Sequence, residues 1–359
     1  MDPRVREHAR IVVDHSTDVS AGDLVVVKLP PGAEDLGVAL HEAIGERGAT
    51  PVYLNGSLRA RRAYLRAAEE YAEPVHETAL YEAADVVIRA RAFDNATEKA
   101  DVPSDDLAAH QSAYSPTKEE LLSKTWCLTQ HPTSGSAQLA GMSTAEYENF
   151  VYDAVTLDWA RQREFQAQMV EILDPAEEVR VVSGDDTDVR MRVAGNHTLN
   201  DDGEANLPGG EVFTAPVKHS VEGEVRFDMP LHRDGREIED VRLTFEDGRV
   251  VDHDADRNEA LLTEILNTDE GARYLGELGI GMNRAIDRFS ANMLFDEKMG
   301  DTVHMAVGKA YPDTVGDDNE CNQSAQHVDM IVDMSEDSRI EVDGEVVQRD
   351  GTFRFEDGF

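Results

Sequence analysis

The chain has 359 residues, enough for two domains, and its 73 acidic residues outnumber 34 basic residues for a formal net charge of −39. Because this charge repels phosphate groups, neither nucleic acid nor an anionic membrane is expected as a partner. Only seven of the basic residues are lysine, while 40% of all residues are hydrophobic. Molar salt screens self-repulsion over a Debye length of about 3 Å, so this composition is typical of a halophilic protein. An acidic protein from an ordinary organism is the alternative.

The chain carries no sequence signal for secretion or membrane insertion. Its two cysteines, Cys127 and Cys321, are far apart and do not predict a disulfide framework. The N-terminus lacks an apolar signal region, and no apolar run approaches 18 residues. We therefore expect a cytoplasmic protein.

The first half of the chain alternates between strand and helix patterns. Residues 24–29 form an apolar run typical of a buried strand, and residues 33–47 have apolar side chains at helical spacing. Residues 51–54 and 86–90 predict two further strands, with a second helix over residues 59–71. This order predicts an α/β domain built on a parallel sheet with helices. No glycine-rich dinucleotide motif follows the first strand.

A helical region leads from this domain towards the second one. Residues 93–106 are polar and predict a loop. Ser143 followed by Glu146 resembles a helix start, and the helical pattern runs, interrupted or not, to about Leu173. Pro175 marks a change of character, so we predict one domain over residues 1–175 and another over residues 176–359.

The second half has the alternation of antiparallel strands. Residues 179–182 and 188–193 alternate around a polar turn, which is a hairpin pattern. The same pattern recurs further on, with strands at 222–227, 241–246 and 249–252, turns at Asp234-Gly235 and Asp247-Gly248, a short helix at 258–266 and a closing hairpin at 339–347. We therefore predict a β-rich α+β C-terminal domain.

Glu211 stands between a sharp turn and a short apolar run. Pro208, Gly209 and Gly210 break regular structure just before it. Because the apolar run is expected to be buried, Glu211 is placed at the edge of the core, where an unpaired carboxylate is costly. A metal cation is one suitable partner; the alternative is an ordinary surface glutamate after a turn.

Four further positions in the second half carry ligand-type side chains in apolar surroundings. Glu277 lies between glycines, and His304 lies within a predicted strand. His327 and Asp329 are two residues apart in another predicted strand, so they project from the same face. One imidazole and one carboxylate on a rigid element form half of a site for a divalent metal.

Each of these residues has a structural alternative. A lone histidine in a strand, such as His304, is more often a hydrogen-bonded core or surface residue than a ligand. Glu277 could cap a turn or pair with Arg273 or Arg284. The metal interpretation depends on their combination. Two glutamates, two histidines and one aspartate in one domain suit two divalent ions that share a bridging carboxylate or water.

Several motifs in chain order resemble the metallo-aminopeptidase family of thermophilic aminopeptidase T and staphylococcal aminopeptidase S. They are residues 207–216, Leu275-Gly276-Glu277, Phe295-Asp296-Glu297-Lys298, His304 with Gly308-Lys309-Ala310-Tyr311-Pro312, and His327-Val328-Asp329. Residues 16–29, 36–52 and 126–127 also resemble the family's N-terminal domain.

The resemblance implies a two-metal exopeptidase that removes N-terminal residues from peptides and acts as a homodimer, with its site in an internal cavity. By their motif positions, the implied metal ligands are Glu211, Glu277, His304, His327 and Asp329, and the cofactors are two divalent ions of Zn, Co or Mn. In one departure, this chain has a glycine at position 210 where family members often carry a first glutamate.

The implied mechanism uses the metals to polarise the scissile carbonyl and to activate a bridging water. Tyr311 is expected to donate to the oxyanion, and Glu211 and Glu277 complete the catalytic set as metal ligands, so the general base is unassigned. Two alternatives are open: Glu211 and Glu277 as the acid/base pair of a metal-free glycosidase, or a non-enzymatic acidic binding protein.

Overall fold

The computed structural model describes residues 1–233 and 235–359, and they form two compact units. Unit 1 contains residues 1–157 together with 203–209, and unit 2 contains residues 158–202 and 210–359. The domain boundary at residue 175 stays a prediction. Among the described residues, no helix combines the length and the apolar character that a bilayer crossing requires.

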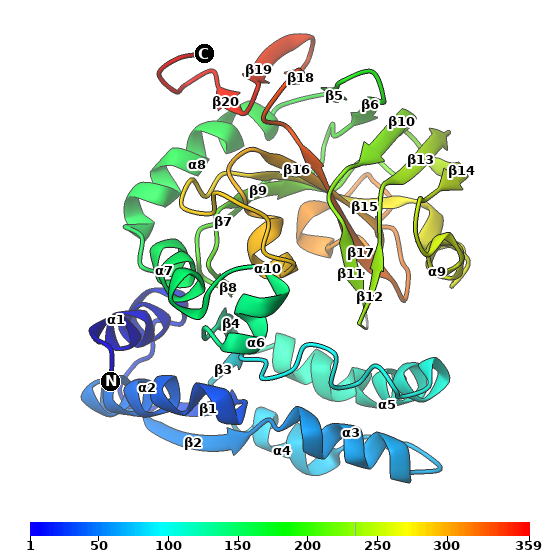
Figure 1. Ribbon diagram of the computed structural model, residues 1–359. Helices are drawn as coiled ribbons and strands as arrows, with labels where there is room; N and C mark the ends of the chain where they lie inside the picture. The colour runs from blue at the N-terminus through cyan, green and yellow to red at the C-terminus, as the bar shows by residue number, and fades with distance from the viewer. Residues whose placement is uncertain (234) are drawn as a thin grey trace. The chain divides into compact units, whose positions relative to one another are not determined.

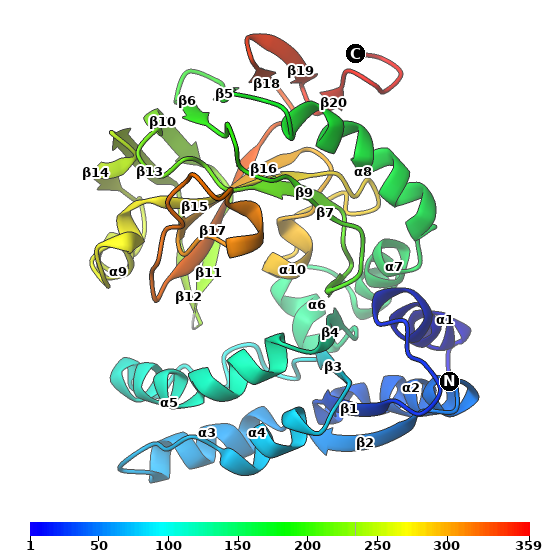
Figure 2. The same ribbon diagram turned by 180° about the vertical axis from the view of Figure 1, so that it is seen from behind.

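Unit 1 is built on a five-stranded parallel sheet in the order β2-β1-β3-β4-β8, flanked by helices (Figures 1 and 2). Its strands are β1 (Leu24–Leu29), β2 (Thr50–Asn55), β3 (Val86–Arg91), β4 (Thr125–Gln130) and β8 (Asn206–Leu207). Its helices are α1 (Pro3–Ile11), α2 (Glu34–Glu46), α3 (Leu58–Ala67), α4 (Val75–Glu82), α5 (Ser104–Leu122), α6 (Ser134–Leu139) and α7 (Thr144–Val155).

The predicted strand–helix–strand order of unit 1 is confirmed. The apolar side chains of β1 and β3 are buried, which is why their runs are continuous rather than alternating. Ser143 caps α7 by accepting a hydrogen bond from the Glu146 amide at 3.2 Å. The polar stretch expected to be a loop up to residue 106 already turns into α5 at Ser104. Only Thr117 and Leu121 of α5 are buried, so this helix has little apolar periodicity for a sequence to display.

Unit 2 contains two larger antiparallel sheets and one two-stranded ribbon. The eight-stranded sheet has the order β14-β13-β10-β6-β5-β18-β19-β20, and β11 pairs with β12. These strands are β5 (Glu178–Ser183), β6 (Thr187–Arg192), β10 (Glu222–Phe227), β11 (Leu231–Arg233), β12 (Arg236–Ile238), β13 (Val241–Glu246), β14 (Arg249–Asp254), β18 (Ser338–Val342), β19 (Glu345–Arg349) and β20 (Thr352–Phe353). The predicted hairpins β5–β6, β13–β14 and β18–β19 are confirmed. Asp234 of the predicted Asp234-Gly235 turn lies outside the described residues.

The second sheet of unit 2 is five-stranded, in the order β17-β16-β15-β9-β7, and Figure 1 shows α8 running beside β7 and β9. Its strands are β7 (Leu199–Asp201), β9 (Glu211–Thr214), β15 (Leu275–Gly281), β16 (Thr302–Gly308) and β17 (His327–Asp333), and the helices of this unit are α8 (Trp159–Leu173), α9 (Glu259–Leu266) and α10 (Met293–Asp296).

One face of this five-stranded sheet belongs to the apolar core. Val212, Leu278, Ile280, Met305 and Met330 point from it into one buried cluster. Because side chains alternate along a strand, the residues between them point to the opposite face. The expected combination of an α/β unit and a β-rich unit is confirmed, and the second face of this sheet carries the candidate site.

Candidate metal centre

The five predicted ligands project from one face of the five-stranded sheet. Glu211 comes from β9, Glu277 from β15, His304 from β16, and His327 with Asp329 from β17. In the antiparallel ladder Glu277 is opposite Ala306, and Ala306 is opposite Asp329, so these side chains share a face. Four neighbouring strands therefore bring together residues that are far apart in the chain.

Small residues on the same face make room for the larger ligands. Gly279 lies opposite His304 in the ladder, and a Cβ atom at this position would be 2.0 Å from His304 Cε1. The imidazole therefore occupies the space that a side chain at position 279 would need. Gly279 therefore admits the ring of His304 beside Glu277.

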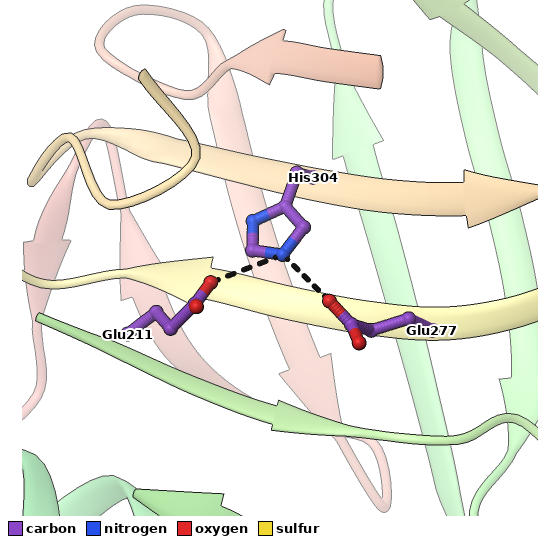
Figure 3. A group of neighbouring side chains, drawn as sticks. All are labelled: Glu211, Glu277 and His304. Carbon is purple, nitrogen blue, oxygen red and sulfur yellow. Dashed lines mark hydrogen bonds and ion pairs between the residues drawn. The ribbon is translucent and has the colours of Figure 1, made fainter. Parts of the chain in front are cut away.

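His304 lies between the two glutamates (Figure 3). Its Nε2 atom is 3.1 Å from Glu211 Oε2 and 3.1 Å from Glu277 Oε1. All three side chains are buried. We call this trio the Glu211 position. Glu277 does not pair with either arginine considered from the sequence, because Arg273 donates to Asn267 and Arg284 pairs with Asp301 and Glu356.

A second trio, the Asp329 position, shares Glu277 with the first. His327 Nε2 is 3.5 Å from Asp329 Oδ1 and 3.9 Å from Glu277 Oε2. Within each trio the possible ligand atoms lie within 4.8 Å of one another, a spacing at which one cation can contact all three. Glu277 presents one oxygen to each trio, which is the arrangement of a bridging carboxylate.

The orientation of both histidines fits metal ligation. His304 Nδ1 is 3.0 Å from the carbonyl oxygen of Glu297, and His327 Nδ1 is 2.7 Å from that of Lys309. Because a carbonyl only accepts, each Nδ1 carries a proton, and each Nε2 faces the carboxylates as the remaining coordinating atom. Glu211 Oε2 and Glu277 Oε2 are buried without a hydrogen-bond partner among the described residues. Divalent cations, one at each trio, would satisfy both glutamates and both imidazoles.

The ionisable groups perturb one another strongly. Burial raises the pKa values of Glu211 and Glu277. Burial opposes the charge of His304, but the carboxylates of Glu211 and Glu277 raise its pKa to about 9. Likewise Asp329 raises the pKa of His327 to about 10, while His327 holds the pKa of Asp329 at about 2. The carboxylates thus attract positive charge to both Nε2 atoms, where a proton and a metal ion compete.

Tyr311 lies beside the Asp329 position. Its ring centroid is 4.8 Å from that of His327 and 6.2 Å from that of Phe213. The residue as a whole is 45% exposed. Removal of the phenol from water, and then the charges of Glu277 and Asp329, raise the pKa of Tyr311 far above its usual value. The hydroxyl therefore stays protonated at neutral pH and is able to donate a hydrogen bond.

A buried lysine and two further carboxylates adjoin the Glu211 position, and sequence reasoning did not select them. Lys298 Nζ is 3.0 Å from Glu211 Oε1 and 3.5 Å from Asp201 Oδ2, and it also contacts the carboxylate of Glu297. The only sequence signal was the run Phe295-Asp296-Glu297-Lys298 among the family-like motifs.

Position 210, where family members often carry a glutamate, requires glycine because of its backbone conformation and its close neighbour. Its φ is +119°, and a Cβ atom there would be 2.4 Å from the Cβ of Asn283. A glutamate at position 210 therefore does not fit this backbone without displacing Asn283.

The comparison with protein families agrees with this geometry. The profile of the family described as thermophilic metalloprotease (M29) matches residues 1–358. The chain belongs to this family. The resemblance seen in the sequence motifs is thereby confirmed, and membership of a metalloprotease family indicates divalent metal ions at a site of this composition.

Similar proteins include several aminopeptidases. The chain is 36% identical over 184 residues to aminopeptidase AmpS of Bacillus subtilis, covering 45% of this chain and 44% of that protein. It is 36% identical over 159 residues to aminopeptidase T of Thermus aquaticus, covering 41% and 37%. The matched region thus spans less than half the length of these relatives.

Two solved structures share the fold over nearly the whole chain. Wild-type AmpT from Thermus thermophilus superposes with a TM-score of 0.88 at 23% identity, covering 98% of this chain and 99% of that one. A 2,5-dihydroxypyridine dioxygenase from Pseudomonas putida has a TM-score of 0.61 at 14% identity, with 98% and 97% covered. At these identities the likeness concerns the fold alone.

Replacing Gly279 by alanine is expected to weaken metal binding at least ten-fold. The added methyl would collide with the ring of His304 and displace it from the glutamates. Loss of orientation around a metal ligand typically costs 10–100-fold in affinity. Metal content after dialysis against a weak chelator measures the effect. Gly45→Ala in α2, where a Cβ meets no atom within 4 Å, is the matched control. Full metal retention by Gly279→Ala would contradict the placement of His304.

Proposed function

We propose that this chain is a metal-dependent aminopeptidase that hydrolyses N-terminal residues from peptides with two divalent ions. The observation that carries the proposal is the double use of Glu277, whose two oxygens serve two ligand trios on one sheet face. Membership of a metalloprotease family and similarity to proteins named aminopeptidases support the reaction class.

The proposed roles follow from the contacts of each residue. Glu211 and His304 would hold one ion, His327 and Asp329 the other, and Glu277 both. Bound metals supply Lewis acidity and a water molecule of lowered pKa. Tyr311, protonated and next to His327, would donate to the oxygen that becomes negatively charged. The backbone carbonyls of Glu297 and Lys309 keep both imidazoles in the coordinating tautomer.

The remaining expectations belong to the same proposal. Mixed nitrogen and oxygen ligands suit Zn, Co or Mn. Following the family resemblance, we expect a homodimer acting on peptide substrates in the cytoplasm, and the acidic composition favours a halophilic source.

The two alternative functions find less support. A glycosidase needs space for a sugar between its two carboxylates, whereas the His304 ring nitrogen lies within 3.1 Å of both Glu211 and Glu277 (Figure 3). A purely structural role leaves one buried carboxylate oxygen of each glutamate without a hydrogen-bond partner among the described residues.

The deciding experiment compares hydrolysis of a free-amino peptide with hydrolysis of its N-acetylated form, with and without a chelator. We expect cleavage of the free-amino peptide only, abolished by the chelator and restored by added metal, with about two ions per chain. Chelator-resistant cleavage, or equal cleavage of both peptides, would overturn the proposal.

Thermal stability is expected to rise with KCl over the molar range. The net charge of −39 produces self-repulsion that salt screens. Melting temperatures from dilute buffer to saturated KCl measure this, with the metal concentration held constant. A flat profile would count against halophilic adaptation.

A further inference from the structure

Lys298 is the least expected residue of the site, because it is a fully buried cation beside proposed metal ligands. Its exposed fraction is 0%, and its ammonium contacts three carboxylates, those of Glu211, Asp201 and Glu297. An ammonium has three N–H donors. Two hydrogen bonds go to Glu211 and Glu297, and Asp201 Oδ2 lies 3.5 Å away as an ion-pair partner, so the contacts of the ammonium are with carboxylates of the chain itself.

Lys298 also lies beside two carboxylates that face each other across neighbouring strands. Asp201 of β7 and Glu211 of β9 are directly opposite each other in the antiparallel ladder. Directly opposed like charges destabilise a sheet, and burial strengthens the repulsion. The ammonium of Lys298 is within 3.5 Å of both carboxylates. Lys298 donates a hydrogen bond to Oε1 of Glu211, while Oε2 of the same carboxylate faces His304.

The charges of this region can be counted from the contacts. Five carboxylates, Asp201, Glu211, Glu277, Glu297 and Asp329, are connected through Lys298, His304 and His327. With both imidazoles neutral, as metal ligands are, the five carboxylates and one ammonium leave four negative charges. Two divalent cations carry the matching positive charge.

We propose that Lys298 is a built-in cation that neutralises part of the negative charge around Glu211. The metal-free protein therefore stays folded, and two divalent ions balance the net charge that remains. This inference rests on the proposed two-metal function. It differs from a ligand-positioning role, in which Lys298 would raise metal affinity by fixing the rotamer of Glu211.

The two roles predict opposite changes in metal binding. If Lys298 acts through its charge, removing it makes the site more negative, so metal binds more tightly and the metal-free protein loses more stability than the loaded protein. If Lys298 acts by holding Glu211 in place, removing it makes metal bind more weakly. Metal affinity and the two melting temperatures form a thermodynamic cycle, so each measurement checks the other.

The test uses Lys298→Met, which keeps the length and apolar character of the side chain while removing its charge. Zn²⁺ affinity is measured by competition with a chromogenic chelator, and melting temperatures are recorded with and without Zn²⁺. We expect at least ten-fold tighter binding of one ion, and a larger fall in melting temperature for the metal-free form. Unchanged or weaker binding would overturn the proposal.

A second variant keeps the proposal testable where Lys298→Met does not fold. Glu297→Gln removes one carboxylate while leaving the backbone carbonyl that orients His304. We expect the opposite result, at least ten-fold weaker binding of one ion and a higher metal-free melting temperature. Unchanged affinity, or a lower metal-free melting temperature, would overturn the charge-balancing role.

Combining Lys298→Met with Glu297→Gln restores the charge count and should return the affinity towards that of the wild type. Lys124→Met, which breaks a pair with Glu120 in unit 1, controls for the overall charge and should leave Zn²⁺ affinity unchanged.

A wild-type chain that binds no metal would refute the proposed function itself. Normal binding of two ions, with the affinity of both single variants unchanged, would refute only the role of Lys298.

Discussion

Asp329→Ala and His327→Ala are each expected to remove metal and activity together. Each change deletes one of three ligands of the Asp329 position, and the two ligands left hold a divalent ion poorly. Changing a residue that merely supports a ligand costs 10–100-fold, so deleting a ligand should reduce kcat/KM by more than about 100-fold. Metal analysis of the purified variants and peptide hydrolysis provide the measurement.

The matched control for these variants is Glu336→Ala. Glu336 is an exposed carboxylate shortly after β17, so its removal changes charge without touching either trio. Wild-type metal content and turnover are expected for it. Two bound ions with normal turnover in Asp329→Ala would show that the Asp329 position does not hold a metal.

Tyr311→Phe is expected to lower kcat by about two orders of magnitude while KM and metal content stay nearly unchanged. The substitution keeps the ring that packs near His327 and Phe213 and deletes only the hydroxyl. Removing one oxyanion donor costs about 10²–10³ in kcat in a well-studied enzyme. An effect on kcat with little change in KM is the signature of an interaction made only in the transition state.

Tyr64→Phe serves as the control, because Tyr64 is a half-exposed phenol in unit 1. Its kcat should equal that of the wild type. Wild-type kcat in Tyr311→Phe would remove this hydroxyl from the mechanism. Loss of metal from the same variant would instead identify the tyrosine as part of the metal coordination.

The placement of two ligands could be predicted from the alternating first half of β17. In β17 the polar residues His327 and Asp329 alternate with the buried Val328 and Met330, so period-two reasoning places both ligands on one face. The sequence alone could not pair β15 with β16 and β9, since strand order depends on contacts between distant segments. The resemblance to a known family supplied that missing association.

Lys298 and Asp201 illustrate what sequence reasoning misses. A lysine after two acidic residues has the pattern of a solvated turn, and nothing local indicates that it is fully buried. Asp201 belongs to a strand of only three residues, too short for a periodic signal. Residues 203–209 likewise pack with unit 1 although their neighbours belong to unit 2, a long-range arrangement with no local signature.

The shared carboxylate of Glu277 has a consequence for how the chain unfolds. Through it, ions bound as proposed would tie β9 to β17 and act as a reversible cross-link between Glu211 and Asp329. Cross-links that close long loops restrict the unfolded chain most, and ligands this distant in sequence cannot hold an ion once the sheet separates. The metal-free sheet, neutralised in part by Lys298, should therefore stay folded but open more readily, and the lifetime of the native state should lengthen as the concentration of free metal rises.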